Sequence, residues 1–189
     1  MNRIDFYLNL LKEKDEYTYK HSKRVAYYSY LIGKQLNFNK KELLNLSCSA
    51  LLHDIGKILI PDDILKCKNK LSKKEYEQIK KHVIYSSIIL NNSFPELIID
   101  IMFHHERING TGYFKIKDIP INSQIISIAD SFDAMTSNRG YNTIKTFDSA
   151  IKELLDDSIN YNLYDINLVN AFYLSLNNKI KVKKKTFLY

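Results

Sequence analysis

Helical spacing of apolar residues runs through almost the whole of this 189-residue chain, and only five glycines and three prolines interrupt it. Apolar residues that recur every three or four positions form one buried face of an α-helix. The chain is therefore expected to be all-α, with Ile58–Ile60 and the Lys-rich end as the only candidate strands. The predicted inward faces carry Ile4, Leu8 and Leu11; Val25, Tyr28, Ile32 and Leu36; Leu43, Leu46, Ala50 and Leu51; Ile125, Ile128, Ala129 and Phe132; Ala150 and Leu154; and Leu168, Ala171 and Phe172.

Capping residues predict where several helices begin. Ser72 and Ser93 are each followed three positions later by glutamate, which is the capping-box pattern, so a helix is expected just after each of them. A further helix is expected over residues 121–137, behind Pro120. Thr146 and Asp165 are the expected N-caps of the last two helices.

Composition places the chain among soluble single-domain proteins. Apolar residues make up 45% and charged residues 26% of the sequence. No basic and apolar leader and no run of eighteen apolar residues is present, so we expect a cytoplasmic protein without a membrane partner. Cys48 and Cys67 are too few for a disulfide framework and are expected to be reduced.

The net charge of +7 is diffuse. An excess of basic over acidic residues favours polyanionic partners in general. In this chain the excess of positive charge comes from lysines spread along the whole sequence. The Lys179–Lys185 run is typical of a solvated tail. We therefore expect no nucleic-acid partner; a basic helical nucleic-acid binder, the least specific alternative, leaves the histidine pattern unexplained.

All five histidines of the sequence fall on or at the ends of predicted helices with apolar neighbours. Burying that many imidazoles is unfavourable unless a partner satisfies them, and a divalent metal is the natural partner. The expected positions are His21 within the second helix, His53 with Asp54 at the end of the third, His82 on the helix after Ser72, His104 and His105 at the end of the next, and Asp130 within the helix over 121–137.

Six segments in this order resemble the HD-GYP family of metal-dependent phosphohydrolases. The resemblance implies an HD-domain helical bundle with extra C-terminal helices. We expect a single catalytic domain over 1–189, with a motif-bearing core at about 17–172 and a Lys-rich tail at 173–189. We expect no separate sensory domain, although family members commonly carry one. The segments are HSKRVA (21–26), LLHDIGK (51–57), His82, HHERINGTGY (104–113), IADSFDAMTSNRGY (128–141) and YDINLVNAF (164–172).

The resemblance also implies a centre of two metal ions, with iron or manganese favoured and zinc, nickel and cobalt left open. Some relatives hold a third metal with a glutamate four residues before the first histidine, where this chain has Tyr17. Asp54 would bridge the two ions. One ion would be held by His21, His53, Asp54 and Asp130, and the other by Asp54, His82, His104 and His105.

Four further side chains match family positions near the substrate. Lys57, which is counted with Asp54 as catalytic, would contact the substrate phosphate and assist proton transfer to the leaving oxygen. Arg139 would reach a phosphate or guanine, to which its planar guanidinium group can donate two parallel hydrogen bonds. Tyr113 would line the substrate groove. Asp133 would lie near the substrate, or alternatively would orient a metal-binding histidine.

The predicted activity is hydrolysis of cyclic di-GMP to pGpG and onward to GMP, by a hydroxide that bridges the two metals. The alternatives left open are an HD phosphohydrolase for another nucleotide, such as cyclic GMP-AMP, a deoxynucleotide or a phosphorylated guanosine, and a cyclic-dinucleotide-binding signalling protein with weak turnover. A separate sensor or a diguanylate cyclase is the expected protein partner.

Departures from the family pattern lie in the loop after the paired histidines and at the rim of the site. They leave every metal-ligand position intact, so they bear on substrate preference rather than on the metal centre. The departures are Phe114 for proline, Ile108–Asn109 for Trp-Asp, a shortened loop up to Ile119–Pro120 that lacks a glycine, Val83 and Tyr85 after His82, and Asn142 for a basic residue.

Overall fold

The computed structural model describes residues 3–67, 69–138 and 143–186, with side chains described up to residue 178. All regular secondary structure in this part of the chain is helical and none of it is strand, which confirms the all-α prediction. None of its helices is long and apolar enough to cross a membrane. The elements are α1 (Arg3–Lys14), α2 (Glu16–Gln35), α3 (Lys40–Leu52), the 3₁₀ helix η1 (Ile55–Leu59), α4 (Asp62–Leu65), α5 (Lys73–Lys80), α6 (His82–Leu90), the 3₁₀ helix η2 (Pro95–Leu97), α7 (Ile98–Met102), α8 (Ile121–Thr136), α9 (Phe147–Tyr161) and α10 (Ile166–Thr186).

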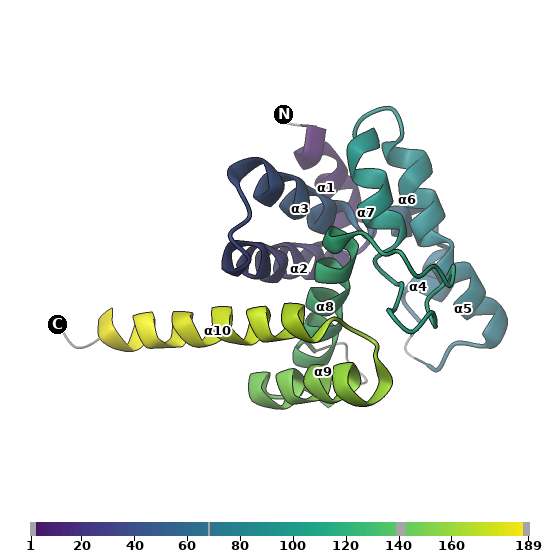
Figure 1. Cartoon of the computed structure of the whole chain (residues 1–189). Helices are drawn as coiled ribbons and strands as arrows, with labels where there is room; N and C mark the ends of the chain where they lie inside the picture. The colour runs from purple at the N-terminus through teal and green to yellow at the C-terminus, as the bar shows by residue number, and fades with distance from the viewer. Residues whose placement is uncertain (1–2, 68, 139–142, 187–189) are drawn as a thin grey trace.

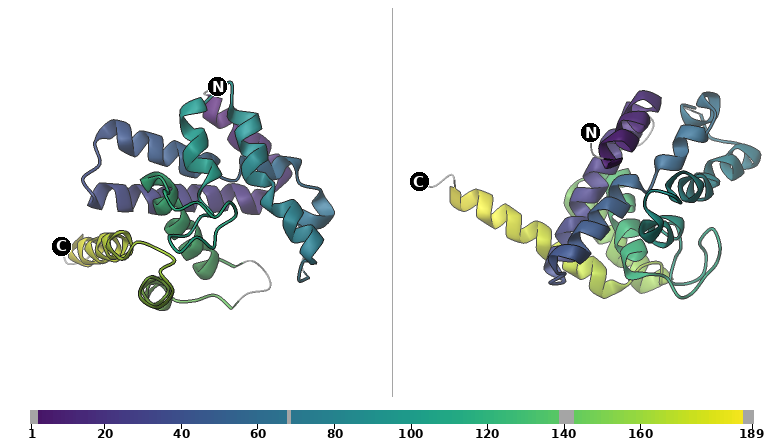
Figure 2. Two further views of the ribbon diagram at one scale, coloured as in Figure 1. Left: turned by 45° about the vertical axis from the view of Figure 1, so that its right-hand side comes forward. Right: turned by 90° about the horizontal axis from the view of Figure 1, so that it is seen from above.

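The helices pack around two apolar clusters (Figures 1 and 2). The larger cluster joins α2, α3, α8, α9 and α10, and its centre is Phe132, whose ring packs edge-on against Phe172 at 4.8 Å and Tyr28 at 5.1 Å between centroids. The smaller cluster joins α1, η1, α6 and α7 around Leu52 and Ile101. The end of α3 contributes to both clusters, so the residues that follow it lie where the two halves meet.

The predicted caps are confirmed for three helices. At α5, the Ser72 hydroxyl accepts the Glu75 N–H at 3.3 Å, and the Glu75 carboxylate accepts the Ser72 N–H at 2.7 Å. Thr146 accepts the N–H of Ser149 at the start of α9, and Asp165 accepts that of Asn167 at the start of α10. α3 begins with a capping box that we did not predict, formed by Asn39 and Glu42.

The predicted cap at Ser93 is wrong. Its hydroxyl instead hydrogen-bonds the Tyr7 hydroxyl at 2.9 Å, and the chain enters η2 before α7. The helix after Ser72 also ends earlier than predicted, because the chain turns at Lys81 and His82 opens α6. α7 ends at Met102, so the paired histidines lie in the turn behind it rather than in its last turn.

Both candidate strands are helical in the structure. Residues 55–59 form η1, and only Ile60 after them is extended. The Lys-rich segment continues α10 as far as Thr186 (yellow in Figure 1), where a solvated tail had been expected. A lysine-rich sequence retains good helix propensity, which allows the helix to continue beyond the packed body.

Gly56 brings η1 against the start of α6. A Cβ atom on this residue would lie 2.0 Å from the His82 carbonyl oxygen and 2.6 Å from the Ser86 nitrogen. The close approach lets Gly56 N–H donate to the Ser86 hydroxyl at 2.9 Å, and that hydroxyl donates to the His53 carbonyl at 3.3 Å. The absence of a side chain at residue 56 therefore joins the segments that carry His53 and His82.

We predict that Gly56→Ala lowers the free energy of unfolding by about 3 kcal/mol, because a clash with backbone atoms cannot be relieved by a rotamer change. The matched control is Gly110→Ala. Gly110 has φ +78° but open space around it, so we expect a loss of about 1 kcal/mol there. Urea denaturation at one fixed manganese concentration compares the two variants, and an equal loss in both would contradict the packing argument.

Candidate metal centre

The five histidines and two of the aspartates converge on one region from five segments of the chain. His21 comes from α2, His53 and Asp54 from the end of α3, His82 from the start of α6, the paired histidines from the turn after α7, and Asp130 from α8. Their side chains form three groups in which the potential ligand atoms all lie within 4.8 Å of one another. The groups are His82, His104 and His105; His21, His53 and Asp54; and His53, His104 and Asp130.

Three of the histidines share one hydrogen-bonding arrangement. The Nδ1 atom of each lies close to the carbonyl oxygen of the residue three positions earlier. A carbonyl oxygen only accepts, so Nδ1 carries the proton and the lone pair is on Nε2. The distances are 2.8 Å for His53 to Ala50, 2.7 Å for His82 to Ile79 and 2.6 Å for His104 to Ile101.

The Nε2 atoms of these three histidines are buried, and none has a hydrogen-bond partner among the described residues. A buried lone pair without a donor is unfavourable unless another group completes it. Imidazole nitrogens with carboxylates are a donor set that divalent transition metals accept, and a backbone carbonyl on the second ring nitrogen is the usual support of such a ligand. The residues present therefore fit a metal site.

Asp54 lies between the groups of histidines. Its Oδ2 atom is 3.4 Å from His53 Nε2 and 3.6 Å from His21 Nε2, while Oδ1 is 3.4 Å from His82 Nε2. Burial acts to raise the pKa of Asp54, but Lys57 and His53 hold this pKa well below its ordinary value. The carboxylate is therefore ionised, with one oxygen facing each side of the site.

Burial keeps most of the imidazoles neutral. It lowers the pKa of His82 to about 4, and it lowers the pKa of His104 and His105 well below the ordinary value, an effect that the neighbouring imidazoles reinforce. His21 differs: burial acts to lower its pKa, but hydrogen bonds with Asp130 and Asp133 raise it. A neutral imidazole can offer its lone pair to a cation without first losing a proton.

Asp133 contacts the Nδ1 side of the His21 ring. Its carboxylate is fully buried, accepts the Arg24 Nε–H at 2.6 Å and the Nη2–H at 2.9 Å, and lies 2.7 Å from His21 Nδ1. A carboxylate occupied in this way faces the histidine rather than a ligand. The structure thus favours the alternative role given to Asp133, orientation of a histidine, over contact with the substrate.

Lys57 reaches the site as expected, with Nζ 2.6 Å from Asp54 Oδ2. The Tyr113 ring lies beside His105, with 4.5 Å between centroids. Tyr76 lines the adjacent cleft, whereas Tyr113 lies against the cluster histidines, and contact of Tyr113 with a substrate stays a prediction. Arg139, together with Asn142, lies outside the described residues.

Glu106 organises the loop that follows the paired histidines. Its buried carboxylate accepts the backbone N–H of Phe114 at 2.8 Å and of Ile116 at 3.0 Å. Gly112 passes so close that a Cβ atom would lie 2.5 Å from Glu106 Cα. The sequence analysis missed this role, although an acidic residue directly before a glycine-containing loop is a signal for it.

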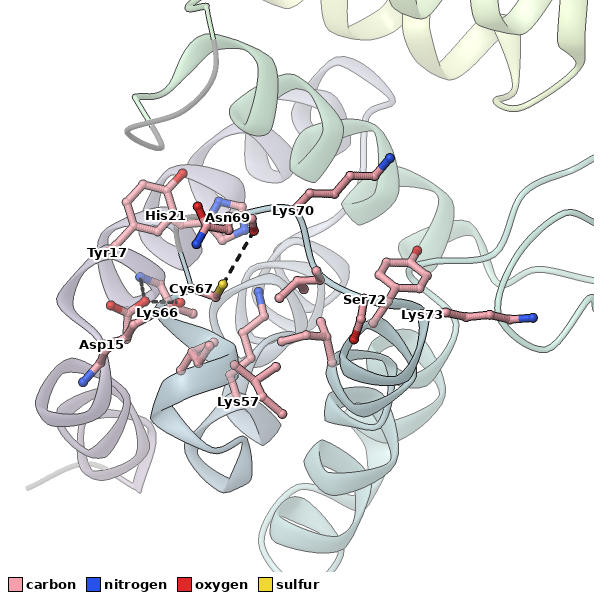
Figure 3. Close-up of a pocket in the computed structure, with 16 residues that line it drawn as sticks. Asp15, Tyr17, His21, Lys57, Lys66, Cys67, Asn69, Lys70, Ser72 and Lys73 are labelled. Atoms are coloured by element: carbon pink, nitrogen blue, oxygen red, sulfur yellow. Dashed lines mark hydrogen bonds between the residues drawn. The ribbon is translucent and has the colours of Figure 1, made fainter.

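A cleft of about 990 Å³ opens beside the cluster (Figure 3). Tyr17 and His21 from α2 line one side, and Lys57 lies in η1 at its centre. Residues of α4, α5 and the segment between them line the rest. An external ligand therefore has access to His21 and Lys57.

The fold and the cluster define an all-helical protein with a buried His–Asp metal-binding site. The chain belongs to the HD domain family, whose model matches residues 6–168. It is 38% identical over 173 residues to a Thermotoga maritima protein named cyclic di-GMP phosphodiesterase, covering 87% of this chain and 46% of that protein. It is 35% identical over 147 residues to a Vibrio cholerae protein named 3'3'-cGAMP-specific phosphodiesterase 3, covering 75% and 32%.

Among solved structures, the HD domain of the L. monocytogenes phosphodiesterase PgpH superposes with a TM-score of 0.68 at 20% identity, over 94% of this chain and 98% of that domain. This likeness confirms the HD-domain fold expected from the sequence. The chain spans less than half the length of the two relatives named above.

We predict that Asp133→Asn lowers the affinity for manganese about 10- to 100-fold, because the amide no longer fixes the orientation and proton position of His21. The matched control is Asp156→Asn on the exposed side of α9, which should bind manganese as the wild type does. Metal titration of the apo protein measures both. Unchanged affinity in Asp133→Asn would contradict the role assigned to this carboxylate.

We predict that Glu106→Gln loosens the loop over residues 111–116. An amide of the same shape accepts only through its single oxygen, so one backbone N–H loses its partner, at a cost of about 2 kcal/mol. Limited trypsin digestion should cleave after Lys115 or Lys117 faster than in the wild type. Glu13→Gln on the exposed face of α1 is the control, and identical digestion of all three proteins would show that Glu106 does not hold the loop.

Proposed function

We propose that this chain is a metal-dependent phosphodiesterase that hydrolyses cyclic di-GMP to pGpG and onward to GMP. The observation that carries the proposal is the set of three buried Nε2 lone pairs on His53, His82 and His104, which lie in one cluster with the ionised Asp54 and Asp130 carboxylates. Structural histidines are ordinarily satisfied on both ring nitrogens, whereas these present one nitrogen each to a shared site.

Two metal ions, iron or manganese, are proposed for this site. His21, His53, Asp54 and Asp130 would hold one ion, and His82, His104 and His105 would hold the other, with Asp54 shared between them. The two carboxylate oxygens of Asp54 support this division, since they face different histidines. When bound, divalent ions neutralise phosphate oxygens and activate water for attack on phosphorus.

The side chains of the protein have separate roles in the proposed reaction. Lys57 Nζ, which lines the cleft and lies against Asp54, would bind a phosphate oxygen and supply a proton to the leaving 3′-oxygen. Arg24 and Asp133 would keep His21 oriented. The packed helices behind the cluster exclude bulk water, which strengthens the electrostatic interactions of Lys57 and of Asp133.

Cyclic dinucleotides are the substrate class best supported. The curated relatives at 35–38% identity carry names of cyclic di-GMP or cyclic GMP-AMP phosphodiesterases. The cleft is large for a mononucleotide, and the described residues that line it include four lysines and a single acidic residue, which suits a ligand with two phosphates. The cyclic GMP-AMP-specific relative makes that dinucleotide the second candidate. A separate sensor or cyclase partner remains a prediction.

The proposal is tested by metal analysis of anaerobically purified protein, followed by chromatography of cyclic di-GMP incubated with it, with and without added manganese or iron. We expect about two metals per chain and formation of pGpG or GMP. Asp54→Ala should lose both metal and turnover, and Asp156→Ala is the matched control that should lose neither.

Other outcomes distinguish the alternatives. Cleavage of cyclic GMP-AMP in preference to cyclic di-GMP would identify the second candidate substrate. Two bound metals without hydrolysis of either compound would contradict the enzyme assignment and favour a binding protein. Full turnover by Asp54→Ala would contradict the proposed metal centre itself.

A further inference from the structure

The cleft beside the metal centre has room for much more than the phosphate that the cluster would bind. Its volume of about 990 Å³ lies at the upper end of the range of roughly 300–1,000 Å³ that is usual for small-molecule sites. It begins at His21 and Lys57 and extends away from the cluster between α2 and α5 (Figure 3). A nucleotide with its phosphate at the cluster would therefore have its base in this space.

The charges around the cleft favour an anionic ligand. Among the described residues, four lysines line it, and Lys70 and Lys73 are exposed at its rim. Asp15 is the one acidic residue in this described lining, and its Oδ2 atom caps α2. It accepts the Thr18 N–H at 2.9 Å and the Thr18 hydroxyl at 2.5 Å. The acidic side chain is therefore turned to its own helix rather than toward a ligand.

Tyr17 supplies a flat aromatic surface where the cleft meets the cluster. It lies one turn before His21 on α2, and the two rings are nearly parallel, with an interplanar angle of 6° and 6.3 Å between centroids. Figure 3 shows the Tyr17 ring at the edge of the cleft beside His21. The next aromatic side chain in the lining, Tyr76, comes from α5.

We propose that Tyr17 is a substrate-binding residue on which a purine base of the dinucleotide stacks. This inference rests on the proposed function, and it assigns Tyr17 to the nucleotide rather than to the metal centre. Every base presents a π-face, so an aromatic ring next to the phosphate site binds bases through stacking and without hydrogen bonds. The phenol hydroxyl is not required for this role, whereas the ring is.

Two substitutions separate the ring from the hydroxyl. Tyr17→Leu keeps apolar bulk beside His21 but removes the π-face, and we expect it to raise KM for cyclic di-GMP about tenfold with kcat and metal content unchanged. Tyr17→Phe keeps the ring and should retain the wild-type KM. Tyr30→Leu, at an exposed tyrosine on the same helix, is the matched control. All are measured on the manganese-loaded 189-residue chain.

Three results would overturn the inference. An unchanged KM in Tyr17→Leu would exclude the stacking role. An equal loss in Tyr17→Leu and Tyr17→Phe would assign the effect to the hydroxyl. A fall in metal content that accounts for the lost activity would show that Tyr17 acts only by packing against His21.

Failure of the proposed function is a separate outcome. If the wild type does not hydrolyse cyclic di-GMP, the same variants are compared by isothermal titration with that compound. Binding that is about tenfold weaker in Tyr17→Leu alone still supports the stacking role. Equal binding by all variants, or no binding by the wild type, overturns it.

Discussion

The Asp54 carboxylate, ionised and removed from water, is the constraint on which the rest of the structure depends. Burial of an isolated charge is strongly unfavourable, so the fold must surround it with groups that favour the ionised form. Lys57 is the nearest of these, and His21, His53 and His82 approach the two oxygens from different helices. Segments from α2, the end of α3, η1 and the start of α6 therefore meet at one carboxylate.

Helix ends set the chemistry of three of the histidines. The last four carbonyls of a helix have no partner within it. Ala50, Ile79 and Ile101 are such residues at the ends of α3, α5 and α7, and each carbonyl lies against the Nδ1 atom of the histidine three positions later. Each of these contacts satisfies one carbonyl at a helix end and leaves Nε2 of the histidine as the acceptor. The points at which α3, α5 and α7 end are therefore part of the site.

The sequence predicted the helices with clear periodicity and the residues of the cluster, because both depend on local spacing or on ordered motifs. It did not predict features that depend on contacts across the fold. Ser93 has the sequence of a capping box, yet its hydroxyl bonds Tyr7, 86 positions away. For Asp133 the sequence left two roles open, and only the contacts of its carboxylate with Arg24 and His21 on another helix favour orientation of the histidine. The break at Lys81 was not predicted either, and it places His82 at the start of α6, with Nε2 3.4 Å from Asp54 Oδ1.

The loop after the paired histidines is held in place independently of most of its own side chains. Glu106 holds this loop through backbone N–H groups, so its path does not depend on the side chains at those positions. Phe114 is partly exposed and packs edge-on against Phe103, at 5.8 Å between centroids. A different residue at 114 would keep both hydrogen bonds to Glu106. Backbone anchoring by Glu106 therefore keeps the path of the loop beside the cluster constant while its side chains can differ.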